Sequence, residues 1–91
     1  MLNDENKKLC CELLAKFGVE AQCIIAIEEC SELQKAICKI LRYDDASYDE
    51  NLREEIADVL AMCQQLMLII KMDMNEANSR IHSKFIRALK R

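Results

Sequence analysis

Proline and tryptophan are absent from this chain of 91 residues, and glycine occurs once, as Gly18. Aromatic residues make up only 4% of the sequence. A β-sandwich or barrel needs turn residues about every 8–12 positions and strands rich in β-branched and aromatic side chains. The composition argues against both, because leucine, isoleucine, methionine, alanine, glutamate and lysine dominate it. We therefore predict an all-α fold that forms a single domain over residues 1–91.

Long apolar runs are lacking as well. The longest stretch without a charged residue is 59–70, which is 12 residues, whereas a membrane-spanning helix needs about 20. The N-terminal residues are polar and contain no apolar signal core. The formal net charge of −3 argues against a general nucleic-acid binder. These observations predict a cytoplasmic protein that contacts neither membrane nor nucleic acid.

Histidine is nearly absent, since His82 is the only one, and the six cysteines include no C-x-x-C pair. A zinc site would need paired cysteines or more histidines, and a disulfide scaffold would suit a secreted chain. Most of the cysteines fall among apolar positions of helical segments. We therefore predict that they are reduced, small, buried core residues. They are Cys10, Cys11, Cys23, Cys30, Cys38 and Cys63.

Start and stop signals divide the chain into four helical segments. Gly18 is placed to end the first, and the sequences Ser47–Glu50 and Asp73–Glu76 are typical of capping boxes that open the last two. A polar segment, residues 43–49, separates the middle pair. The segments predicted to be helical are 4–17, 20–42, 47–71 and 73–89.

Four helices joined by short loops favour a compact antiparallel four-helix bundle. Hydrophobic residues make up 52% of the chain, more than the core of so small a bundle can hide. We therefore expect oligomerisation to complete the fold, as a homodimer or a dimer of dimers.

Charge is unevenly placed along the chain. Residues 1–74 carry a net charge of −7, whereas residues 75–91 carry +4. The basic residues Arg80, Lys84, Arg87 and Arg91 repeat at four, three and four positions, which places them on one helical face. This pattern fits a stripe that faces an anion, and it equally fits a solvated face that complements the helix dipole.

Two acidic clusters interrupt otherwise apolar helices. The second helix contains Glu28, Glu29 and Glu32, and the third contains Glu54, Glu55 and Asp58. At about 100° per residue, Glu29 falls within the apolar stripe of its helix and Glu32 at its edge, while Glu55 and Asp58 flank the stripe of theirs. Glu28 and Glu54 point to the polar side. Four carboxylates are thus predicted to face a neighbouring helix.

Carboxylates at the margin of a core are costly unless they are protonated or neutralised by a cation. A ligand set of oxygens alone suits Mg²⁺, with Mn²⁺ as the alternative. The simpler interpretation is that these are surface acids paired with lysines, such as Glu28 with Lys35 or Glu32 with Lys39. Because both pairs occur at the same register, we favour the metal site. A di-iron bundle needs Glu-x-x-His, which neither cluster contains.

The two clusters resemble the signature of the MazG-type, all-α nucleoside triphosphate pyrophosphohydrolases, which is EExxE, a spacer and ExxD. Here Glu28-Glu29-x-x-Glu32 is followed by 22 residues and then by Glu55-x-x-Asp58. The run DVLAMCQQL, residues 58–66, is also similar to the family. In the last helix Lys84 and Phe85 match, while His82 stands where the family usually has asparagine. The resemblance covers roughly residues 20–90.

The resemblance implies Mg²⁺-dependent cleavage of a nucleoside triphosphate between its α- and β-phosphates, which releases the monophosphate and pyrophosphate. It assigns Glu29, Glu32, Glu55 and Asp58 as catalytic metal ligands, one of which could orient the attacking water. The base and sugar preferred stay open, because similar bundles act on dUTP and on phosphoribosyl-ATP.

The basic residues of the last helix are candidates for binding the outer phosphates. Lys84 and Arg87 are the first of these, with Lys35 or Lys39 as additions from the second helix. The residues that could stack on a base are Phe17, Tyr43, Tyr48, Phe85 and His82, although for Phe17 and Phe85 we expect ordinary core packing. The alternative to an enzyme is a non-catalytic helical module that binds a nucleotide or a protein.

Overall fold

The computed structural model describes residues 2–43 and 46–91. They form four α-helices and one short 3₁₀ turn, with no strand among the described residues, so the all-α prediction is confirmed. Residues 44 and 45, part of the predicted polar segment, lie outside the described residues. The elements are α1 (Asp4–Phe17), α2 (Val19–Arg42), η1 (Ala46–Tyr48), α3 (Asp49–Ile70) and α4 (Met74–Leu89).

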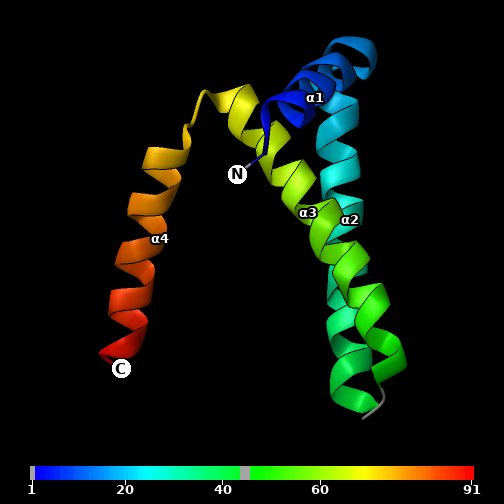
Figure 1. Cartoon of the computed structure of the whole chain (residues 1–91), viewed down its shortest axis with the longest axis vertical. Helices are drawn as coiled ribbons and strands as arrows, with labels where there is room; N and C mark the ends of the chain where they lie inside the picture. The colour runs from blue at the N-terminus through cyan, green and yellow to red at the C-terminus, as the bar shows by residue number, and fades with distance from the viewer. Residues whose placement is uncertain (1, 44–45) are drawn as a thin grey trace.

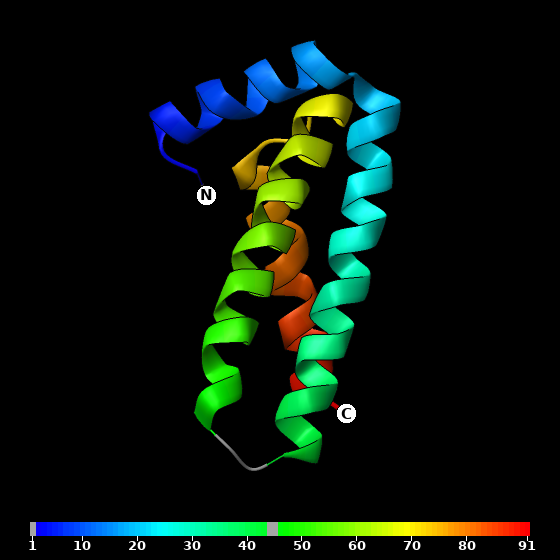
Figure 2. The same cartoon turned by 90° about the vertical axis from the view of Figure 1, so that its right-hand side faces the viewer.

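Helices α2 and α3 run antiparallel and pack side by side along their length (Figures 1 and 2). Small side chains line this contact, and Ala26 and Ala36 of α2 are both buried. On α3, Met62 and Met67 are also buried. Most of the buried residues in the described part of the chain therefore belong to α2 and α3.

The single glycine fixes the position of α1. Gly18 has a φ of +87°, a left-handed conformation that L side chains rarely adopt, and it joins α1 to α2 without a loop. Its N–H still donates to the carbonyl of Leu14, and its carbonyl accepts from Gln22. The chain therefore turns sharply, and α1 lies across one end of the α2–α3 pair (Figure 2).

Capping residues explain the other helix ends. The Asp73 carboxylate accepts a hydrogen bond of 2.8 Å from the N–H of Glu76 and so opens α4, as predicted. Lys71 adopts a left-handed conformation, with φ 61°, that ends α3. The N-cap of α3 is Tyr48, one residue later than the predicted Ser47, because η1 leads directly into the helix.

Helix α4 stands apart from the rest of the chain. Among the described residues, no Cα atom of α4 lies within 8 Å of a Cα atom of α1, α2 or α3, and Figure 1 shows α4 separated from the α2–α3 pair. The radius of gyration is 15.3 Å, whereas a compact chain of this length would have about 12 Å. The four predicted helices are therefore present, but a single chain does not close them into a compact bundle.

Many side chains are exposed in this open arrangement, which corrects the predicted burial of the cysteines and of Phe17 and Phe85. The cysteines are free, but Cys10 alone is buried, because a pair of helices covers only the residues on its seam. Phe17 and Phe85 are 53% and 66% exposed, so neither is packed in a core. No helix among the described residues is both long and apolar enough to cross a membrane.

Candidate metal centre

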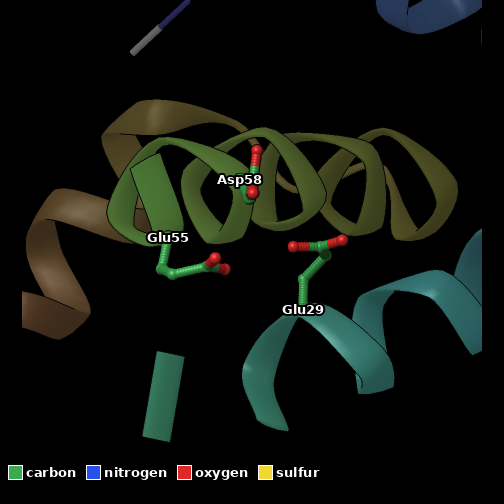
Figure 3. Close-up of side chains that lie close together, drawn as sticks. All are labelled: Glu29, Glu55 and Asp58. Atoms are coloured by element: carbon green, nitrogen blue, oxygen red, sulfur yellow. The ribbon is translucent and has the colours of Figure 1, made fainter. Parts of the chain in front are cut away.

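Three of the four predicted ligands meet between α2 and α3. Glu29 extends from α2 towards Glu55 and Asp58 of α3, as Figure 3 shows. One carboxylate oxygen from each residue lies within 4.8 Å of the others. The antiparallel packing of α2 and α3 produces this cluster, because it sets the two acidic motifs at the same height.

The local sequence explains why these acids and not their neighbours meet. Glu55 and Asp58 are three residues apart and so lie on one face of α3. Glu28 and Glu54, one position before the cluster on each helix, are exposed. The helical-wheel prediction is therefore confirmed for these two residues and for Glu29, Glu55 and Asp58.

The cluster fits a hard divalent cation. Glu29 and Glu55 are half-buried, and one carboxylate oxygen of Glu55, Oε2, is buried without a hydrogen-bond partner among the described residues. A buried carboxylate oxygen without a donor is costly and requires a positive partner. Three carboxylates together supply the oxygen ligands that Mg²⁺ or Mn²⁺ prefers.

The electrostatics of the cluster act most strongly on Glu29. Partial burial raises the pKa of Glu29, and the negative charge of Asp58, with a hydrogen bond to the same residue, raises it further. The charges of Glu55 and Glu32 act in the same direction. Like-charged carboxylates at this distance favour protonation of one of them. A cation would relieve the same repulsion by replacing that proton.

The fourth predicted ligand, Glu32, lies outside the cluster. Its side chain is 51% exposed and pairs with Lys35, with 3.3 Å between Nζ and Oε1. Lys35, a predicted phosphate-binding residue, therefore neutralises an acid of the EExxE motif in this structure. The pair is exposed and so stabilises the fold little.

The predicted substrate-binding residues of the last helix are not near the carboxylates of their own chain. His82, Lys84 and Arg87 are exposed on α4, whose backbone stands apart from α2 and α3 among the described residues. Arg80, from the same basic stripe, pairs with Glu76 at 2.9 Å. A single chain thus presents the acidic and basic residues on separate surfaces.

An open cavity of about 300 Å³ adjoins the carboxylates, and we call it the slot. Glu29 and Asp58 lie in its wall, together with two buried glutamines, Gln22 and Gln65. Leu13 and Phe17 of α1 contribute the rest of one side. Three other cavities, of about 330, 400 and 510 Å³, include none of the clustered carboxylates, although Gln65 also borders the cavity of about 400 Å³.

The two slot glutamines were missed by the sequence analysis, although a signal for them exists. Gln22 precedes Glu29 by seven residues, and Gln65 follows Asp58 by seven. Seven residues are two helical turns, so each glutamine lies on the same face as its acid. Because the helices are antiparallel, both glutamines fall on the same side of the cluster.

The comparison with known families agrees with this site. The family model described as the MazG nucleotide pyrophosphohydrolase domain matches residues 17–90. The chain belongs to this family. The matched residues of this MazG domain include both acidic motifs and all of α4, whereas all but the last residue of α1 lies outside them. No curated protein and no solved structure matches the chain.

Proposed function

We propose that this MazG domain is a Mg²⁺-dependent pyrophosphohydrolase that converts a ribo- or deoxyribonucleoside triphosphate to its monophosphate and pyrophosphate. The observation that carries the proposal is the cluster of Glu29, Glu55 and Asp58, with its unpartnered carboxylate oxygen. Membership of a nucleotide pyrophosphohydrolase family supports the class of reaction.

In this proposal the three carboxylates bind the catalytic cation together. Glu29, Glu55 and Asp58 would hold the cation, and a bound Mg²⁺ supplies charge neutralisation and polarisation of the phosphate. Water adds across the anhydride between the α- and β-phosphates, so that the bridging bond breaks and pyrophosphate leaves. A carboxylate of the site accepts the proton of that water. Glu32, once released from Lys35, is the proposed fourth ligand.

A second copy of the chain is the proposed partner of α4. The apolar side chains of Ile81, Phe85 and Leu89 are 45%, 66% and 83% exposed within their own chain. The apolar cavity of about 510 Å³ along α2, with Ile27 71% exposed beside it, is a matching surface. The charges agree too, since residues 75–91 carry +4 and the rest of the chain −7.

In such a homodimer α4 brings a basic face to the acidic body of the other copy. We propose that Lys84 and Arg87 bind the outer phosphates of a substrate held by the partner's carboxylates, with His82 nearby. This assignment resolves why the acidic and basic residues are on separate surfaces of one chain.

The test is to incubate purified protein with a panel of ribo- and deoxyribonucleoside triphosphates and to identify the products. We expect monophosphate and pyrophosphate in the presence of Mg²⁺, and no turnover when EDTA is added. Release of inorganic phosphate with the diphosphate would contradict cleavage between the α- and β-phosphates. No turnover of any nucleotide would favour the alternative, a non-catalytic helical module.

A further inference from the structure

The slot has two chemically different ends. Glu29 and Asp58 mark one end, and Gln22 and Gln65 mark the other. Each glutamine is seven residues from the acid on its helix, which is a rise of about 10 Å. Phe17 of α1, which is 53% exposed, borders the slot as well.

Gln65 carries a buried polar atom whose hydrogen bonding is unsatisfied. It is only 3% exposed, and its carbonyl oxygen, Oε1, has no hydrogen-bond partner among the described residues. A buried amide oxygen without a partner costs free energy, and native proteins rarely leave one unsatisfied. Gln22, also 3% exposed, is in the wall of the same cavity. Both glutamines therefore lie in the wall of a cavity that opens to solvent.

We propose that Gln65, with Gln22, binds the nucleobase of the substrate and determines which base is accepted. A carboxamide presents a donor beside an acceptor, and the polar edge of a nucleobase presents the complementary pair. The exposed ring of Phe17 offers a face on which the base stacks. The inference rests on the proposed function, in which Glu29, Glu55 and Asp58 hold the cation beside the anhydride that is cleaved.

The spacing agrees with this assignment. From the carboxylates to the glutamines the slot runs along two helical turns, and a nucleotide must extend from its α-phosphate across the sugar to the base. Apolar side chains such as Leu13 and Met62 line the slot and fit the faces of a base or sugar.

The first experiment needs no metal and no hydrolysis. The side-chain amide signals of Gln65 are followed by NMR while adenosine, guanosine, cytidine, uridine or thymidine is added, with ribose as the control. We expect at least one nucleoside to shift the Gln65 amide signals and ribose to leave them in place. If no nucleoside moves them more than ribose does, the inference is wrong.

The second experiment compares matched variants. Gln65→Met keeps the volume and removes the amide, so its fold is expected to be retained. Gln64→Met is the control, because Gln64 is 5% exposed with an unpartnered Oε1 but is not a slot residue. We expect Gln65→Met to lower kcat/KM for the preferred triphosphate about 10-fold and to reduce the difference between bases, while Gln64→Met changes neither.

The outcomes separate this inference from the proposed function. Hydrolysis with an unchanged ranking of bases in Gln65→Met overturns the inference alone. Nucleoside binding at Gln65 without hydrolysis of any triphosphate overturns the proposed function alone. If Gln65→Met fails to fold by circular dichroism, Gln22→Met is measured in its place, with the same two criteria.

Discussion

At the scale of single residues, Glu29 determines the charge balance of the acidic cluster. Its pKa is raised, so the folded protein binds a proton more tightly there than the unfolded chain does. Without metal, this residue therefore reduces stability as pH rises above the ordinary glutamate pKa of about 4.3. The half-exposed position limits the effect through solvent screening.

Glu29→Gln should therefore stabilise the metal-free protein at neutral pH. We expect its Tm in EDTA to exceed that of the wild type by about 2–4 °C at pH 7, which corresponds to about 0.5 kcal/mol. The difference should shrink towards zero below pH 4, where the wild-type carboxyl is protonated too. Thermal denaturation at several pH values measures both; a variant less stable than the wild type at pH 7 would contradict the repulsion argument.

Substitution of two adjacent glutamates should change the Mg²⁺ affinity very differently. Glu55→Gln removes a proposed ligand, and we expect Mg²⁺ affinity to fall at least about 10-fold, as happens when even a partner of a ligand is lost. Glu54→Gln is the matched control, because Glu54 precedes Glu55 and is exposed. Isothermal titration calorimetry gives both affinities. Equal loss in the two variants would show that general acidity, and not the cluster, attracts the cation.

Helical periodicity was sufficient to predict most of the cluster, and its limits are physical. The 3.6-residue period correctly separated Glu29 and Glu55 from Glu28 and Glu54. It could not show that Glu32 pairs with Lys35, because a side chain at the edge of the apolar stripe can turn either to a lysine on its own helix or to the facing helix. Gln65 was missed because a glutamine in an apolar helix gains its role from the residues facing it.

At the scale of elements, α4 is the helix that sequence patterns could not place. Its bounds were predicted to within one residue, since Asp73 caps it, but a capping signal says nothing of what a helix packs against. The sequence predicted a compact four-helix bundle that oligomerisation completes. Within one chain of the structure, Phe85 and Leu89 of α4 are largely exposed.

Charge placed at these apolar residues of α4 should break the proposed dimer. Phe85→Glu puts a carboxylate where an apolar ring is expected to be buried. We expect the dissociation constant of the dimer to rise at least about 100-fold. Ser83→Glu adds the same charge on the opposite face of α4 and should leave the molar mass of the assembly in solution unchanged. Light scattering across a dilution series measures this. A wild-type protein that is monomeric at every concentration would refute the proposed partner.

At the scale of the whole molecule, the separation of acidic and basic surfaces leads to a prediction about dimers that contain one copy each of two different variants. Glu29→Gln lacks a proposed metal ligand, and the double variant Lys84→Ala, Arg87→Ala lacks the proposed phosphate contacts. If α4 acts on the partner, each mixed dimer contains one intact site.

Mixing the two inactive proteins should therefore restore activity. Random exchange makes half of the dimers mixed, so we expect up to about a quarter of the wild-type rate. The rate of pyrophosphate release after mixing, compared with each protein alone, measures the recovery. Mixtures that exchange subunits yet stay inactive would place the basic residues and the acids of each site on the same chain.

The turn at Gly18 divides the residues that line the slot between α1 and the α2–α3 pair. The carboxylates and the glutamines belong to the stretch that matches the family, whereas Leu13 belongs to a helix that precedes it. The turn at Gly18 therefore sets where one wall of the slot stands relative to the carboxylates of α2 and α3. A substitution at this turn or in α1 would change the opening of the slot, while every acid stays in place.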